Sequence, residues 1–518
     1  MITEMLARNS RMYGDEIALI EREPASNKRS EMTWQQFDAL SSQTANALRR
    51  QGLQKGDRVV QLMMNCIEWL PVYFGILRAG AIAVPLNFRF QSADLSRCVR
   101  LCQARALMFG EEFIGRIDES KSEMDQWVQA YVYVGPASKR PEYSILYADF
   151  LKDTANQAPD VPISLCDGAG IYFTSGTTGK PKGVYLTHRH LEFACYAENR
   201  HHNQIHTDNF LCIPPLYHTG AKMHWFGNLI VGARAVILKG VNPQAILEAV
   251  SEEGVTIVWL LVPWAHDILV AIESGALDLR DYRLAQWRLM HIGAQPVPPS
   301  LIQKWRYYFP THEYDTNYGL TEATGPGCVH LGMENFHKIG SIGCPGFDWE
   351  CRIIDDAGVD APPEAPGELL VKGPGVMAGY YQNPDATTAV LKDGWLHTGD
   401  IARKDADGFI WLIDRKKDVI ITGGENIFPV EIENFLMTHD DIFDAGVIGL
   451  PDTRLGEIVA AVIALKPGKA LSEADVRGFC EDLPKYMRPR RIFFDDIPRN
   501  PTGKIEKPRL REKYAKKG

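Results

Sequence analysis

The sequence predicts an α/β protein with a large N-terminal domain of α/β layers, mainly parallel in their sheets, and a small α+β C-terminal domain. The chain has 518 residues, which is too long for a single hydrophobic core. Helical and strand patterns of apolar residues alternate over most of this length, as is typical of parallel sheets covered by helices. From Gly367 onward, short strands separated by turns replace the alternation.

The individual elements follow from spacing and from stop signals. The first long helical pattern ends at Gly52, a residue that favours the end of a helix, and one strand pattern ends at Pro263. The expected helices are 34–52, 69–79 and 245–253, and the expected strands are 58–64, 81–85, 255–262, 368–371 and 408–413.

The domain boundary is expected at residues 414–417, which read Asp-Arg-Lys-Lys. Residues 1–414 would then form the N-terminal domain and residues 415–518 the C-terminal domain. A charged turn within one domain is the alternative for these four residues, and the sequence alone leaves both open.

Composition excludes several classes of protein. The net charge is −9, from 56 basic and 65 acidic residues, which argues against a nucleic-acid binder. No apolar run is long enough to span a membrane, and the first residues lack the pattern of a signal peptide. The ten cysteines contain no CxxC pair, so we expect reduced thiols and neither disulfides nor zinc. A soluble cytoplasmic enzyme is the expectation.

A loop rich in glycine and hydroxyl groups follows the apolar strand pattern 169–173. Glycines let a backbone approach an anion, hydroxyls donate to phosphate oxygens and lysines supply charge. The spacing is not that of a Walker A loop, and a flexible surface turn is the alternative. The residues are Thr174, Ser175, Gly176, Thr177, Thr178, Gly179, Lys180, Pro181, Lys182 and Gly183.

The segment resembles the signature loop of the adenylate-forming superfamily, and the later motifs resemble its AMP-forming acyl-CoA synthetase branch. The order and spacing of the motifs match that family from about residue 33 to residue 511. The resemblance implies that Thr174 to Lys182 hold the β- and γ-phosphates of ATP, and that the small C-terminal domain is mobile.

Residues 318–322, Tyr-Gly-Leu-Thr-Glu, resemble a second motif of the family. The resemblance implies that Tyr318 stacks on adenine, that Thr321 contacts the α-phosphate, and that Glu322 binds Mg²⁺. A turn resembling the family's adenosine pocket precedes the motif, and it consists of Gly293, Ala294, Gln295 and Pro296. This chain departs from the family just before that turn, where His291 and Ile292 replace small hydroxylic residues.

The resemblance assigns further residues to the nucleotide and to the thiol. Asp400, at the end of the segment 394–400, would hold the ribose of AMP with help from Arg415, although an ordinary turn is the alternative. Lys504 would bridge the carboxylate and the α-phosphate in the first half-reaction. Lys417 falls at the hinge position. Gly423 and Gly424 would line the pantetheine tunnel after the small domain rotates.

The acid is less defined than the nucleotide. Glycine at position 319, where acetate-specific relatives have tryptophan, predicts an acid larger than acetate. His218 occupies the gate position, and a purely structural histidine is the alternative. The expected acyl-pocket walls are Met223, Trp225, Trp259, Val262, Pro263 and Gly319. Lys222 and His224 would instead address a second polar group, as in carnitine-like or dicarboxylic acids.

The expected function is an AMP-forming carboxylate–CoA ligase that uses ATP, Mg²⁺ and coenzyme A. A medium-chain, branched, cyclic or aromatic acid fits the expected pocket. A free-standing adenylation enzyme that loads a carrier protein is the alternative. A homodimer remains open, and the pattern around Lys504 resembles one that lysine acetyltransferases modify in some relatives.

Overall fold

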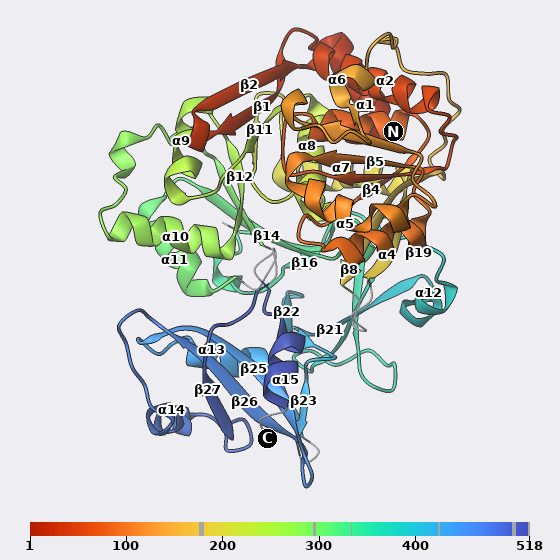
Figure 1. Ribbon diagram of the computed structural model, residues 1–518. Coiled ribbons are helices and arrows are strands. Elements are labelled where there is room, and N and C mark those ends of the chain that lie inside the picture. Colours follow the sequence, from red (N-terminus) through yellow and green to blue (C-terminus); the bar gives the residue numbers. More distant parts are fainter. Residues whose placement is uncertain (176–180, 294–296, 333, 423–424, 500–503, 516–518) are drawn as a thin grey trace.

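The computed structural model describes residues 1–175, 181–293, 297–332, 334–422, 425–499 and 504–515. Figure 1 shows a larger part formed by the N-terminal residues and a smaller part, coloured blue, formed by the C-terminal residues. Strands β21 (Trp395–Lys404) and β22 (Ile410–Arg415) lie where the two parts meet.

A nine-stranded sheet, called the first sheet here, carries the centre of the larger part. Its inner strands β14, β13, β12, β10, β11 and β1 are parallel, whereas β2, β15 and β16 pair antiparallel at its edges. The strand order is β16 (Cys344–Pro345), β15 (Pro326–Leu331), β14 (Glu313–Gly319), β13 (Leu289–Gly293), β12 (Ile257–Leu261), β10 (Asn209–Cys212), β11 (Arg234–Leu238), β1 (Ile17–Glu23) and β2 (Lys28–Thr33).

A second sheet of eight strands completes the larger part. It is parallel except at the edge formed by β8, β9 and β19, and its order is β19 (Gly379–Tyr380), β9 (Pro181–Thr187), β8 (Gly168–Ser175), β4 (Ile82–Pro85), β3 (Arg58–Leu62), β5 (Ala106–Gly110), β6 (Ala130–Val134) and β7 (Ile145–Leu146).

Two smaller sheets follow. The third sheet is antiparallel and contains β17 (Glu350–Ile354), β18 (Gly367–Lys372), β21, β20 (Leu391–Lys392) and β22. The fourth sheet contains β24 (Glu425–Ile427), β23 (Ile420–Thr422), β26 (Gly456–Leu465), β25 (Ile442–Asp452) and β27 (Arg491–Phe494).

Along the chain, most of the described helices alternate with the strands of the two large sheets. They are α1 (Ile2–Met12), α2 (Trp34–Arg50), α3 (Trp69–Arg78), α4 (Ser92–Cys102), α5 (Ile114–Met124), α6 (Tyr147–Phe150), α7 (His188–His202), α8 (Thr219–Val231), α9 (Pro243–Glu253), α10 (Val262–Glu273), α11 (Pro299–Tyr308), α12 (Pro384–Val390), α13 (Pro429–Leu436), α14 (Glu473–Phe479) and α15 (Lys507–Ala515).

Local sequence explains how α2 and α3 pack together. A capping box starts α2, because the Thr33 hydroxyl accepts from the Gln36 backbone N–H while the Gln36 side chain accepts from the Thr33 backbone N–H. Every residue of α3 is buried, as expected for a helix that is apolar on all sides. The two helices approach closely at Gly75, where an added Cβ would lie 2.4 Å from the Cβ of Thr44.

The structure confirms the predicted fold class and the predicted elements, with ends that differ by a few residues. The predicted helix 34–52 is α2, and the chain then turns at Gly52 with a φ of +83°. The predicted strand 255–262 is β12, and Val262 and Pro263 instead begin α10. Among the described residues, no helix has the length and apolar character needed to cross a membrane.

The chain changes sheets close to the expected domain boundary. Strand β22 ends at Arg415, and β23 begins the fourth sheet at Ile420. The fourth sheet has an apolar core of its own that includes Ile432, Val447 and Ile463. This arrangement is compatible with a boundary at 414–417, which stays a prediction.

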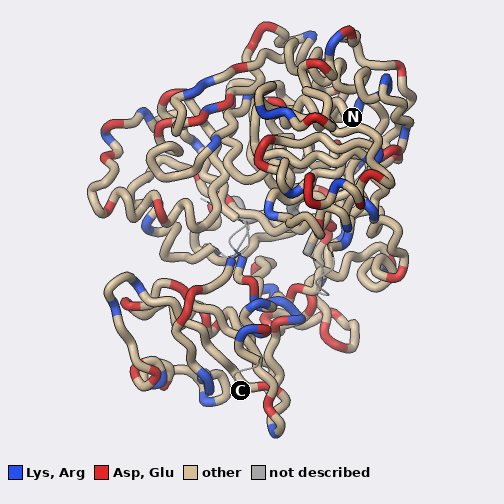
Figure 2. The backbone as a smooth tube through the Cα atoms, in the orientation of Figure 1, with Lys and Arg blue, Asp and Glu red and all other residues tan. Residues whose placement is uncertain are grey.

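Charged residues of both signs are interspersed along the chain. Figure 2 shows Lys and Arg next to Asp and Glu over both parts of the molecule. A site for an anionic ligand therefore depends on the local arrangement of side chains and not on the overall charge.

Candidate active site

Tyr318, Asp400 and Arg415 form a polar corner between the first and third sheets, in which Tyr318 and Asp400 are buried and Arg415 is exposed. Asp400 and Arg415 are direct partners across β21 and β22. The Tyr318 hydroxyl donates to Asp400 Oδ2, and Arg415 Nε lies 2.6 Å from Asp400 Oδ1. Burial and then the Asp400 charge raise the pKa of Tyr318 well above its usual value, so the phenol remains a donor. A carboxylate has about four lone-pair positions, so Asp400 retains capacity for ribose hydroxyls.

The hairpin of β8 and β9 places a lysine near Glu322, on the far side of the motif 318–322 from Tyr318. Lys182 pairs with Thr174 across the hairpin, and its Nζ lies 5.0 Å from the centre of the Tyr380 ring. The Tyr380 hydroxyl donates to Glu322 Oε1 at 2.9 Å. A hydroxyl, an ammonium and a carboxylate therefore lie close together, which suits a phosphate and its counter-ion.

Glu322 is chemically suited to hold magnesium. Its carboxylate is partly exposed and offers hard oxygen ligands, which Mg²⁺ prefers. The neighbouring Thr321 hydroxyl accepts from the Thr219 hydroxyl at 3.5 Å, next to the start of α8. The motif 318–322 thus connects the polar corner at Tyr318 with the group of Lys182, Tyr380 and Glu322 that suits a phosphate.

His218 and Lys504 approach the same region from different domains. His218 is the residue before α8, and burial, followed by the charges of Lys222 and Lys504, lowers its pKa to about 3. It is therefore neutral at physiological pH. Withdrawal from water and the Arg415 charge lower the pKa of Lys504, while Asp400 and Glu322 oppose the shift. Lys504 lies at the surface, just before α15.

Some predicted site residues lie at the ends of strands or in turns, and others lie outside the described part of the chain. Ser175 ends β8, and only its backbone is described. Gly319 ends β14 and is exposed, and Lys417 is exposed in the turn between β22 and β23. The residues outside the described part of the chain are Gly176, Thr177, Thr178, Gly179, Ala294, Gln295, Pro296, Gly423 and Gly424.

Trp259 lies between two glycines, Gly220 on α8 and Gly293 at the end of β13. A Cβ added to Gly220 would lie 3.1 Å from Cη2 of Trp259, and one added to Gly293 would lie 3.8 Å from its Nε1. Trp259 Nε1 is buried and has no hydrogen-bond partner in the part of the chain that the structure describes. The indole therefore presents a free donor beside Gly293.

The other expected pocket walls do not all join Trp259. Val262 and Pro263 follow β12 directly, in the first turn of α10. Met223 is fully buried in the main core. The Trp225 ring instead packs against Phe37 and Phe74, which belong to α2 and α3. Trp225 therefore lies in the helical layer and is not brought together with Trp259.

Lys222 and His224 face different surroundings on α8. Lys222 is fully buried, with its Nζ 4.4 Å from the centre of the Tyr172 ring and 5.3 Å from that of Tyr73. Burial lowers its pKa well below the usual value. His224 instead packs edge-on against Trp259, with 4.4 Å between ring centres. These positions do not support a joint role for the two residues in binding a second polar group.

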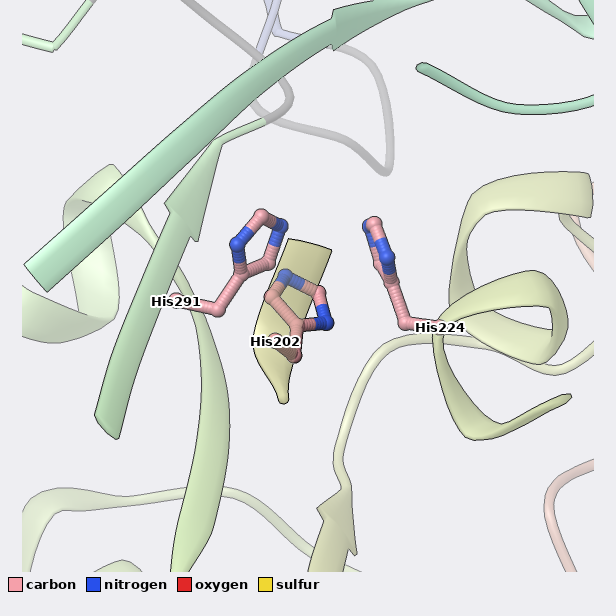
Figure 3. Close-up of side chains that lie close together, drawn as sticks. All are labelled: His202, His224 and His291. Carbon is pink, nitrogen blue, oxygen red and sulfur yellow. The ribbon is translucent and has the colours of Figure 1, made fainter. Parts of the chain in front are cut away.

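A buried group of three histidines and two carboxylates lies next to Trp259. Trp259, His291 and Asp315 are direct neighbours across β12, β13 and β14. Helix α7 adds Glu198 and His202, and α8 adds His224. Figure 3 shows the three histidine rings converging from three different elements. We call these five groups, Glu198, His202, His224, His291 and Asp315, the histidine cluster.

The carboxylates determine the protonation of the histidine cluster. Burial alone would raise the pKa of Glu198, but His224 and His202 outweigh it and lower that pKa to about 2. Burial would lower the pKa of His202, and Asp315 outweighs it, so that the pKa is raised. For His291, burial prevails and lowers the pKa to about 4. The carboxylates thus favour the protonated form of His202, whereas burial favours the neutral form of His291.

Sequence reasoning missed part of this cluster. His291 was noticed as a departure from the family and His224 as a polar position, but Glu198, His202 and Asp315 were not identified. The available signal was a pair of histidines at the end of a helical pattern, followed much later by an aspartate three residues before Tyr318. Spacing along the chain does not connect such distant positions.

The chain matches proteins of known family over most of its length. Residues 6–381 match the family AMP-binding enzyme, and residues 431–504 match the AMP-binding enzyme C-terminal domain. A feruloyl-CoA synthase of Amycolatopsis sp is 33% identical over 93% of this chain and 94% of its own length. A 2-succinylbenzoate–CoA ligase of Bacillus cereus is 31% identical, with 93% of each chain covered. The crystal structure of an anthranilate CoA ligase in complex with anthranoyl-AMP is 26% identical and superposes with a TM-score of 0.89, covering 99% of this chain and 97% of that one.

Proposed function

This chain belongs to the AMP-binding enzyme family, and on that premise we propose that it joins a cyclic, aromatic, branched or medium-chain acid to CoA. The broader activity, an AMP-forming CoA ligase that uses ATP, Mg²⁺ and CoA, follows from the family and its relatives. The similar proteins named for ferulate, succinylbenzoate and anthranilate favour an aromatic acid among these classes.

The first half-reaction activates the acid. A carboxylate oxygen attacks the α-phosphorus of ATP, the bond to pyrophosphate breaks, and an acyl-adenylate forms. We propose that Tyr318 and Asp400 hold the adenosine, that Thr321 and Lys504 donate to the reacting groups, and that Lys182 contacts the outer phosphates. Mg²⁺, held at Glu322, would offset the charge on pyrophosphate. Positioning and charge stabilisation carry this step, and no protein nucleophile is required.

The observation that supports this assignment is that Lys504 lies near the polar corner formed by Tyr318, Asp400 and Arg415. Lys504 follows the fourth sheet, yet the charges of Arg415, Asp400 and Glu322 act on it, and its own charge acts on His218. A lysine from the small domain therefore lies near the residues proposed to hold the ribose and Mg²⁺. This arrangement suits the adenylate-forming step.

The second half-reaction transfers the acyl group. The thiol of CoA loses its proton and attacks the carbonyl carbon, and the bond to AMP breaks. We propose that the small domain rotates at Lys417 between the steps, which removes Lys504 and brings Gly423 and Gly424 to the thiol tunnel. The same boundary would separate residues 1–414 from 415–518.

Pyrophosphate release, measured over a panel of carboxylic acids with and without CoA, tests the proposal. We expect release with aromatic and medium-chain acids, weak release with acetate, and AMP formation that depends on CoA. AMP release that requires a carrier protein in place of CoA would favour a free-standing adenylation enzyme.

Gly319→Trp tests the predicted size of the acyl site. An added indole would occupy space at the end of β14 that the predicted acyl site leaves open for the acid. The variant should lose activity on large acids and keep or improve its activity on acetate and propionate, measured as kcat/KM. A native enzyme that strongly prefers acetate would contradict the prediction, and Trp259 would then be the residue that closes the site.

Three further features remain predictions. A cytoplasmic location and a homodimer rest on composition and on the family resemblance. Acetylation of Lys504 would remove its charge and silence the first half-reaction. The exposed part of Lys504 makes the side chain accessible to a modifying enzyme. Mass spectrometry that finds Lys504 always free in cell-derived protein would count against this modification.

A further inference from the structure

The histidine cluster is a continuous series of contacts that ends in one ring nitrogen of His224 and one of His291. His224 Nδ1 lies 2.8 Å from Glu198 Oε2, which lies 3.4 Å from His202 Nδ1. On its other side, His202 Nε2 lies 3.2 Å from Asp315 Oδ2, and Asp315 Oδ1 is hydrogen-bonded to His291 Nδ1. Both ring nitrogens of His202 thus face carboxylates, while His224 and His291 each face a carboxylate with Nδ1.

The carboxylates fix the tautomers of the two outer histidines. A ring nitrogen that faces a carboxylate carries the hydrogen, because two lone pairs would repel each other. In the neutral form of either ring, Nε2 is then the hydrogen-bond acceptor. His291 Nε2 is buried and has no hydrogen-bond partner among the described residues. The two rings are also close to each other, with 4.3 Å between their centres.

Trp259 adds the complementary donor. Its Nε1 is buried, has no partner among the described residues and lies 3.8 Å from where a Cβ at Gly293 would be. Its ring contacts His224 edge-on. A hydroxyl group can accept from the indole N–H and donate to an imidazole at the same time, which neither a methyl group nor a carbonyl can do.

We propose that the histidine cluster and Trp259 Nε1 bind a hydroxyl group at the end of the acid that lies farthest from its carboxyl group. This inference rests on the proposed CoA-ligase function and names its substrate class as hydroxylated acids. Glu198, His202 and Asp315 act as positioning residues that hold the two outer histidines as acceptors.

The position of His224 on α8 explains why the hydroxyl is distant from the carboxyl. His218, next to Lys504, lies at the end where the carboxylate reacts. His224 follows six residues later, and a rise of 1.5 Å per residue separates the two by about 9 Å along the helix axis. A phenolic or ω-hydroxy acid spans that separation better than a 2-hydroxy acid does.

A metal ion is the other ligand that three histidines suggest. The nitrogens of His202, His224 and His291 lie within 4.8 Å of one another, and carboxylates behind histidines are common at zinc sites. A structural zinc site uses four protein ligands, however. His202 faces carboxylates with both nitrogens, which leaves two histidines, so the arrangement favours a hydroxyl.

Matched acids that differ only in one group test the proposal. The pairs are 4-hydroxycinnamate with 4-methylcinnamate and 8-hydroxyoctanoate with nonanoate, so that size is held nearly constant. We expect the native enzyme to prefer the hydroxylated member by about 10²-fold in kcat/KM, because the methyl analogue leaves buried polar atoms unpaired. Calorimetric Kd values for the same pairs measure the preference in binding even if an acid is not turned over.

The variant His224→Phe removes the acceptor while keeping an aromatic ring against Trp259. The preference should fall to within about threefold of unity, mainly through loss of activity on the hydroxylated acid. His312→Phe is the matched control, because His312 is a buried histidine that stacks on Trp287 and Phe309. That variant should keep the native preference.

The possible outcomes separate the inference from the function on which it rests. Pyrophosphate release without preference for the hydroxyl, or a preference that His224→Phe leaves unchanged, would overturn the inference but leave the ligase function. Absence of pyrophosphate release with every acid would contradict the function, and the Kd values would then decide the inference. Stoichiometric zinc in purified protein, lost in His224→Phe, would show a metal site in place of a hydroxyl site.

Discussion

Glu322 connects the Tyr318 motif to the phosphate side through a single carboxylate group. Its oxygen accepts from Tyr380, whose ring lies beneath Lys182. Glu322, the Tyr380 ring and the Lys182 ammonium thereby limit one another's movement. Such restriction helps to hold a phosphate and a cation in a fixed geometry.

Glu322→Gln should raise the Mg²⁺ concentration needed for half-maximal activity by about tenfold and lower kcat, because one ligand charge is lost while the shape is kept. A magnesium titration of pyrophosphate release checks this. Glu350→Gln on β17 is the control, since Glu350 pairs with Lys372 away from the site. Unchanged activity of Glu322→Gln at limiting magnesium would rule out the assignment.

His312 predicts how acid destabilises the fold. Burial lowers its pKa from 6.5 to about 4. Between these values the unfolded chain binds more protons than the folded one, so its contribution to stability is unaffected above pH 6.5 and is lost as the pH falls toward 4. The loss is at most about 3 kcal/mol, at 1.36 kcal/mol per pKa unit.

His312→Phe should therefore flatten the dependence of the melting temperature on pH between 6.5 and 4. Scanning calorimetry at several pH values measures it. His266→Asn should leave the dependence unchanged, because the His266 side chain is 58% exposed. An equally steep dependence in His312→Phe would assign the acid sensitivity to other buried groups.

Among the secondary-structure elements, the contact between α8 and β12 determines the shape of the proposed acyl site. One face of α8 presents Gly220 and, one turn later, His224, and both contact Trp259. Another face holds Trp225 against α2 and α3. Glycine at position 220 allows the helix to approach the indole directly.

Gly220→Ala should push Trp259 toward the acid, because the new Cβ would lie 3.1 Å from Cη2. We expect kcat/KM for aromatic acids to fall about tenfold, as overpacking of a buried contact costs roughly 1–3 kcal/mol, with little change in ATP affinity. Gly115→Ala in α5 is the control, since its Cβ would meet nothing within 4 Å. A parallel loss of ATP affinity would indicate a general folding defect.

The whole molecule places one lysine of the small part beside the site of the large part. The last helix, α15, supports the junction: Lys507 Nζ lies 3.9 Å from Asp414 Oδ1 and 3.0 Å from Glu433 Oε1, and Arg511 pairs with Asp418. The loop before α15 carries Lys504. Contacts at the junction therefore influence where Lys504 lies.

Lys504→Ala should reduce adenylate formation by about 10²–10³-fold, the usual cost of losing one well-placed donor. Thioester formation from a supplied acyl-adenylate should persist, because the proposed rotation removes Lys504 from that step. Lys469→Ala, which removes an exposed ion pair with Asp441, should affect neither step. Equal loss of both half-reactions would contradict the proposal that the small domain rotates between them.

The sequence by itself determined the α/β class, the helices and strands with strong periodicity, and the order of the nucleotide motifs. The predicted site residues Thr174, Tyr318, Glu322, Asp400 and Lys504 came from short segments, the Thr174 loop from its residue types and the others mainly from the family resemblance, and their roles stay predictions. Local spacing suffices for such segments, since the chain itself holds their members together.

Only the tertiary structure decided what surrounds the proposed acyl site. Helix α8 is buried on nearly every side, so periodicity does not reveal that Trp225 faces α2 while His224 faces β12. His291 and Asp315 meet because of the register of parallel strands, and α7 adds Glu198 and His202 from another layer. Register and layer packing are set by contacts between distant segments, and no spacing within one segment encodes them.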